Sequence, residues 1–133
     1  MARVGNRILP GRYTLGSWSV LGAEDAQKAL DKRVLSTQRL VVIRCEYEKD
    51  ADFPVHSHLQ EQITIVEEGQ LEFVIEGKSL LVSKGEMISI CPRVPHETRV
   101  AGPGRAVALN LFLHELEART SAPSSKAPAP SRF

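Results

Sequence analysis

The sequence has few of the features that mark a protein that binds nucleic acid or a membrane. Aromatic residues make up only 5% of the 133 residues, which is too few for a surface on which bases could stack. The formal net charge is +1, so no large field attracts a polyanion or an anionic bilayer. We therefore expect neither nucleic acid nor a membrane among the partners.

Cysteines and long apolar runs are also scarce. Cys45 and Cys91 are too few for a disulfide framework, and we interpret both as reduced core thiols. No apolar run reaches the length of about 18 residues that a membrane-spanning helix needs. The segment Met1–Leu15 carries arginines but lacks the apolar stretch of a secretory signal. These absences predict a cytoplasmic location.

The chain length predicts one domain with distinct ends. Residues 1–35 are predicted to form an N-terminal arm with one short helix over residues 23–33, where good helix formers occur without Gly or Pro. Residues 36–117 have the composition of strands and should form the folded unit. Residues 118–133 are rich in Pro, Ser and Ala, so we expect a disordered tail.

Short strands separated by glycine turns dominate the middle of the chain. Residues 71–76 alternate between two faces, and residues 62–68 are rich in β-branched side chains. Gly69, Gly77 and Gly85 mark turns, and the short strands recur at spacings near ten residues. This pattern predicts an all-β antiparallel sandwich or barrel and argues against a parallel α/β architecture.

Three of the four histidines fall into a spaced pattern with a glutamine. His56 and His58 are two residues apart, so in an extended strand their imidazoles share a face. Gln62 opens the next predicted strand, and Glu61 has the opposite parity and should point away. His96 follows a segment with two prolines, which should form a turn that presents it inward.

These segments resemble the two motifs of the cupin family. From His56 to Gly69 the order is His-x-His, a short spacer, a ligand position and a closing glycine. From Gly85 to His96 the second motif is present, including Pro92. The chain differs at two points, because Gln62 stands at the acidic position and a proline replaces the glycine before the last histidine.

The resemblance implies a fold and a cofactor. The fold is an antiparallel cupin barrel, also called a double-stranded β-helix or jelly roll. The cofactor is one divalent metal ion, which could be Zn, Ni, Fe, Co, Mn or Cu, held by His56, His58, Gln62 and His96. Cupins are often dimers, and an N-terminal arm can pair with a neighbour's sheet edge, so we expect a homodimer.

The sequence leaves the function open between three hypotheses. Four neutral ligands favour non-redox Lewis-acid chemistry on a small enolisable carbonyl compound, by an isomerase, cyclase or lyase. The chain is similar to the ketonising cupins of unsaturated uronate breakdown and to the cupin-type polyketide cyclases. The alternatives are a metal-dependent dioxygenase and a non-catalytic cupin that binds a small ligand. Candidate barrel-lining residues at the catalytic site are Tyr47, Asn110 and Phe112.

Overall fold

The structure, a computed structural model, describes residues 13–21 and 29–114, and all its regular elements there are strands. In those two ranges no helix is long and apolar enough to cross a membrane. The strands are β1 (Leu30–Ser36), β2 (Leu40–Tyr47), β3 (Asp52–His56), β4 (Gln62–Glu68), β5 (Gln70–Ile75), β6 (Lys78–Ser83), β7 (Met87–Ile90), β8 (His96–Ala101) and β9 (Ala106–Leu113).

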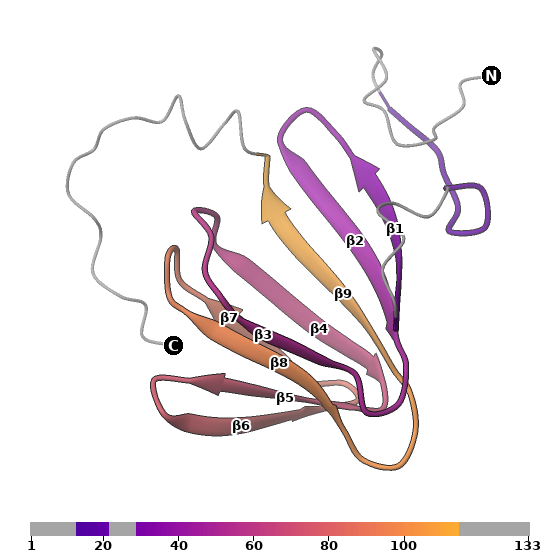
Figure 1. The fold of residues 1–133 in the computed structure, drawn as a ribbon. Helices are drawn as coiled ribbons and strands as arrows, with labels where there is room; N and C mark the ends of the chain where they lie inside the picture. Colours follow the sequence, from indigo (N-terminus) through magenta and orange to yellow (C-terminus); the bar gives the residue numbers. More distant parts are fainter. Residues whose placement is uncertain (1–12, 22–28, 115–133) are drawn as a thin grey trace, which may run out of the picture.

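The strands form two antiparallel sheets, which Figure 1 shows as two layers. The five-stranded sheet has the order β1-β2-β9-β4-β7, and the four-stranded sheet has the order β3-β8-β5-β6. Strands distant in sequence are therefore neighbours, because β9 lies between β2 and β4 and β8 lies between β3 and β5. This is the antiparallel jelly-roll arrangement that the sequence predicted.

The predicted N-terminal helix is wrong over its last residues. Residues 30–33 belong to β1, which pairs with β2 from Leu30 opposite Tyr47 to Ser36 opposite Val41. Pairing along a whole strand outweighs the weak helix preference of a few residues. Residues 22–28, which hold most of the expected helix, lie outside the described residues, as does the expected tail over 118–133. The sheet thus begins at residue 30 rather than at residue 36.

The core lies between the sheets and follows the alternation along each strand. In β5, Leu71 and Phe73 are 0% and 1% exposed, whereas Glu72 between them has the opposite parity and forms an ion pair with Arg99 at 2.9 Å. The predicted alternation of this strand between two faces is therefore confirmed, and the face with Leu71 and Phe73 is the inner one. The buried cluster consists of Cys45, Tyr47, Ala51, Val66, Leu71, Phe73, Val82, Ile90, Val100, Ala106 and Ala108.

Gly69, in the turn between β4 and β5, occupies a position that only glycine fits. Its φ is +76°, and a Cβ there would lie 2.4 Å from the carbonyl oxygen of Arg105. The turn can therefore contact the backbone at the start of β9 directly. This contact helps to align β4 with β9, the two strands that meet beneath the site described below.

The outer face of the five-stranded sheet carries aliphatic side chains. Ile63 lies opposite Leu111, and Ile65 lies opposite Leu109, all with the parity that faces away from the core. Ile63 is 39% exposed and Met87 on β7 is 60% exposed. This exposed aliphatic face does not by itself establish the homodimer expected from the sequence, which stays a prediction.

Candidate metal centre

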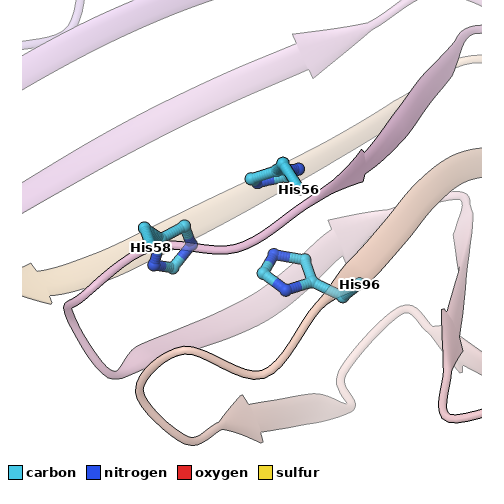
Figure 2. Close-up of side chains that lie close together, drawn as sticks. All are labelled: His56, His58 and His96. Atoms are coloured by element: carbon cyan, nitrogen blue, oxygen red, sulfur yellow. The ribbon is translucent and has the colours of Figure 1, made fainter.

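Three histidines lie together in the structure, as Figure 2 shows. His56 ends β3 and His96 begins β8, and the two residues are paired across these strands. His58 lies two residues beyond the end of β3, so the expected placement of His56 and His58 on one strand is wrong. The predicted turn before His96 includes Pro92, and His96 begins β8 with its side chain buried. One ring nitrogen from each histidine lies within 4.8 Å of the others, so one ion can contact all three.

Each histidine presents its Nδ1 nitrogen to a backbone carbonyl oxygen. The distances are 3.3 Å from His56 to Pro54, 3.0 Å from His58 to Gln60 and 2.9 Å from His96 to Val94. A carbonyl accepts, so Nδ1 donates its hydrogen and the Nε2 lone pair remains for a ligand. The Nε2 atom of His96 is buried and has no hydrogen-bond partner. A cation at this point would satisfy it.

The amide of Gln62 faces the same cluster from the opposite sheet. Gln62 begins β4 in the five-stranded sheet and is buried, whereas the adjacent Glu61 is exposed. Its Oε1 atom lies 2.9 Å from Nε2 of His58. With the hydrogen of His58 on Nδ1, facing the carbonyl of Gln60, both atoms of this pair can offer lone pairs to an ion beside them. The four residues therefore fit a divalent cation.

A cavity of about 440 Å³ adjoins the cluster. It lies between the two sheets, because its lining comes from both. Of the residues in the described ranges, it is lined by Leu30, Lys32, Ile43, Cys45, Tyr47, Phe53, Pro54, Val55, His56, His58, Gln62, Phe73, His96, Thr98, Asn110 and Phe112. Every candidate site residue from the sequence is in this set, and Glu61 is not.

The sequence of residues 43–112 matches the profile of the cupin domain. The chain belongs to the cupin family. The match extends from within β2 to within β9 and includes all four residues of the candidate metal centre. A comparison with curated proteins gave no match.

Solved structures of other cupins have the same fold. An RmlC-like cupin from Shewanella frigidimarina is 21% identical, covers 78% of this chain and 91% of its own, and has a TM-score of 0.66. The polyketide cyclase RemF from Streptomyces resistomycificus is 22% identical, with 77% and 80% covered and a TM-score of 0.68. KdgF from Halomonas is also 22% identical, with 68% and 85% covered and a TM-score of 0.60. At these identities the similarity establishes the fold.

In this cupin the three candidate catalytic residues differ in their surroundings. Burial raises the pKa of Tyr47 far above its usual value, so its hydroxyl stays protonated at neutral pH and cannot serve as a base. Asn110 is buried and hydrogen-bonded to Thr64 at 2.5 Å. The ring of Phe112 meets the ring of His58 edge-on, with centroids 5.5 Å apart, and limits where that imidazole can turn.

The sequence reasoning missed several polar residues at the site. Lys32, Cys45 and Thr98 line the cavity, and Thr64, behind the wall, is hydrogen-bonded to Asn110, as is Cys45. A signal existed for Thr64, because it lies two residues after Gln62 on the same strand and therefore shares its face. For Cys45 the information lies in the pairing of β2 with β9, which the sequence does not display.

The site should make the stability of the metal-free protein depend on pH. Burial, chiefly, and the neighbouring histidines lower the pKa of His96 below its ordinary value of 6.5. Below pH 6.5 the unfolded chain binds a proton that the folded chain resists, so the free energy of unfolding should fall as the pH falls. The slope from this group is at most about 1.4 kcal/mol per pH unit, and it declines toward zero as the pH rises through 6.5.

Urea unfolding of the metal-free protein between pH 5 and 8 measures this slope. The variant His96→Gln lacks the titrating group, so its slope should be smaller than that of the parent chain. Equal slopes for the two proteins would show that His96 does not carry the effect.

Proposed function

We propose that this cupin is a metal-dependent, non-redox enzyme that acts as an isomerase, cyclase or lyase on a small enolisable carbonyl compound. The observation that carries the proposal is the convergence of three imidazole nitrogens and one amide oxygen on the wall of a mainly apolar cavity between the two sheets. His56, His58, His96 and Gln62 would hold the ion.

The charge of the ligand set determines the kind of chemistry. All four proposed ligands are neutral, so a divalent ion held by them would keep its full charge and would supply Lewis-acid polarisation of a carbonyl oxygen. Iron enzymes that activate oxygen commonly use two histidines and a carboxylate. Among the described residues no carboxylate lines this cavity, and Glu61 is exposed. The ligand set therefore supports Lewis-acid chemistry over oxygen activation.

The lining supports an apolar carbon skeleton for the substrate. The rings of Phe53, Phe73 and Phe112 and the side chains of Leu30 and Ile43 cover much of the wall. A sugar acid needs several hydrogen-bond partners for its hydroxyl groups, and of the polar side chains in this wall other than the proposed ligands, Cys45, Tyr47 and Asn110 are already hydrogen-bonded among themselves. Of the two enzyme groups that the sequence resembles, the lining is thus better suited to the cyclases of poly-β-ketone chains.

A non-catalytic, ligand-binding role is the second candidate, and one observation favours it. Apart from the histidines, the titratable side chains in the described lining are Lys32, Cys45 and Tyr47. Burial raises the pKa of both the Cys45 thiol and the Tyr47 hydroxyl, so neither is a base near neutral pH. A protein with this wall could bind a carbonyl compound without moving its protons.

Proton exchange in D₂O tests the proposed activity. The full chain, loaded in turn with Zn²⁺, Ni²⁺, Co²⁺ and Mn²⁺, is incubated with aromatic and aliphatic β-diketones, and the α-protons are followed by NMR. We expect metal-dependent exchange above the rate of the free metal ion and no uptake of oxygen. The same assay with unsaturated uronates tests the preference for an apolar skeleton.

The variant Gln62→Glu separates metal binding from catalysis. It should keep or tighten metal binding but slow the exchange, because a negative ligand offsets part of the charge on the ion. Oxygen uptake by the parent protein would instead indicate a dioxygenase. Binding of a diketone by the loaded protein without any exchange would indicate the ligand-binding role.

A further inference from the structure

A buried chain of hydrogen bonds continues from Gln62 across the five-stranded sheet, away from the histidines. The Nε2 atom of Gln62 donates to Oγ1 of Thr64 at 2.8 Å, and it lies 3.4 Å from Oδ1 of Asn110. Thr64 in turn donates to Oδ1 of Asn110 at 2.5 Å. All three side chains are at most 7% exposed, so these hydrogen bonds lie in a low-dielectric surrounding in which an unpaired polar group is costly.

The backbone places the three residues for this contact. Gln62 and Thr64 are two apart on β4 and share its inner face. Asn110 on β9 is the direct cross-strand partner of Thr64. The far end of the Asn110 amide, Nδ2, lies 3.3 Å from Sγ of Cys45 and 3.4 Å from Oη of Tyr47 on β2. The amide of Asn110 thus has acceptors on its nitrogen side and a donor on its oxygen side.

This arrangement determines which end of the Gln62 amide faces the histidines. With its nitrogen bonded to Thr64, Gln62 presents its oxygen to His58. Reversing the amide would bring its oxygen toward the oxygens of Thr64 and Asn110. The single hydrogen of the Thr64 hydroxyl could then serve only one of the two amide oxygens, so one of them would lose its donor unless Asn110 reverses as well, and that reversal would cost Asn110 its bonds to Cys45 and Tyr47 as they stand. The orientations of the two amides are therefore coupled through Thr64.

We propose that Thr64 and Asn110 are positioning residues that hold the Gln62 amide with its oxygen toward the metal. The inference rests on the metal centre of the proposed function. Without this support the amide can turn and donate from Nε2 to the lone pair of His58. That hydrogen bond would remove two ligand atoms from the site at once, because the amide oxygen would point away and the imidazole lone pair would be occupied.

Thr64→Val tests the inference with little change of shape. Valine has nearly the volume of threonine but no hydroxyl, so the close acceptor for Gln62 is lost. We expect Co²⁺ to bind the metal-free full chain about 10- to 100-fold more weakly, the usual effect of losing an outer hydrogen-bond partner of a metal ligand. The visible absorption of bound Co²⁺ should also change, because it reports the coordinating atoms. Thr64→Ser retains the hydroxyl and should restore the affinity and spectrum of the parent.

A double-mutant cycle shows whether Thr64 acts through Gln62. In the background of Gln62→Ala there is no amide to orient, so adding Thr64→Val should change Co²⁺ affinity by less than about twofold. Full additivity of the two substitutions, or a Thr64→Val protein that binds Co²⁺ like the parent, would overturn the inference while leaving the metal centre intact. A parent chain that binds no Co²⁺ would overturn both. Thermal unfolding of each variant without metal separates lost stability from lost orientation.

Discussion

The variant His96→Ala is expected to lose divalent-metal binding almost completely. Of the three histidines, His96 is the most buried, at 1% exposed, and its Nε2 atom has no hydrogen-bond partner. Its Nδ1 hydrogen is donated to the carbonyl of Val94, so the ring is held in one orientation before any metal arrives. Loss of a direct ligand held in this way should weaken metal binding by more than the roughly 10- to 100-fold that follows the loss of a hydrogen-bond partner behind a ligand.

Competition with a chromophoric chelator measures this affinity for Zn²⁺ and Co²⁺. The matched control is His114→Ala, which removes the fourth histidine, located just after β9 and absent from the cavity lining. The control should bind metal like the parent chain. If His96→Ala binds Zn²⁺ within about threefold of the parent, the metal centre is wrong, and the ligand-binding role becomes the leading hypothesis.

The variant Phe73→Ala should cost about 3–5 kcal/mol of unfolding free energy. Phe73 is 1% exposed in the middle of β5, and its ring forms part of the wall of the cavity. Removing the ring loses its burial and enlarges an existing cavity, which neighbouring side chains cannot fill without moving the sheets. A loss of this size is a large part of the 5–15 kcal/mol that holds a typical domain together, so much of the variant could be unfolded.

Urea unfolding of the parent chain and of Phe73→Ala gives the difference in unfolding free energy directly. Leu81→Ala is the control, because Leu81 is 57% exposed on the neighbouring strand β6 and should cost no more than about 0.5 kcal/mol. A loss below about 1 kcal/mol for Phe73→Ala would mean that the two sheets close over the missing ring. The core would then be more adaptable than its burial suggests.

The strands that the sequence predicted best have either clear alternation or many β-branched side chains. The β-branched segment over 62–68 is β4, and the alternation over 71–76 is that of β5. β1 was missed because Leu30–Arg33 have good helix propensity and only their pairing with β2 makes them a strand. The sequence of β8 also alternates, because the charged Glu97 and Arg99 separate His96, Thr98 and Val100, which are buried in the structure. The prolines before this strand indicated a turn instead.

The candidate site was predictable where spacing along the chain determines it. The motif positions of His56, His58, Gln62 and His96 come together in space, and strand parity separates Gln62 from Glu61. The hydrogen bonds that orient the Gln62 amide were not predictable in this way. Its partner on β9 follows in the chain only after four intervening strands, so their contact depends on the register between strands rather than on local spacing.

The origin of the candidate ligands in both sheets has a consequence for how long the folded state lasts. His56 and His96 belong to the four-stranded sheet, and Gln62 belongs to the five-stranded sheet, so a bound ion would join the two layers. The layers could then separate only after the ion had left one of them. If separation belongs to the rate-limiting step of unfolding, metal should slow unfolding more than it speeds folding. Protease resistance at a fixed temperature would then follow the lifetime of the ion in the site.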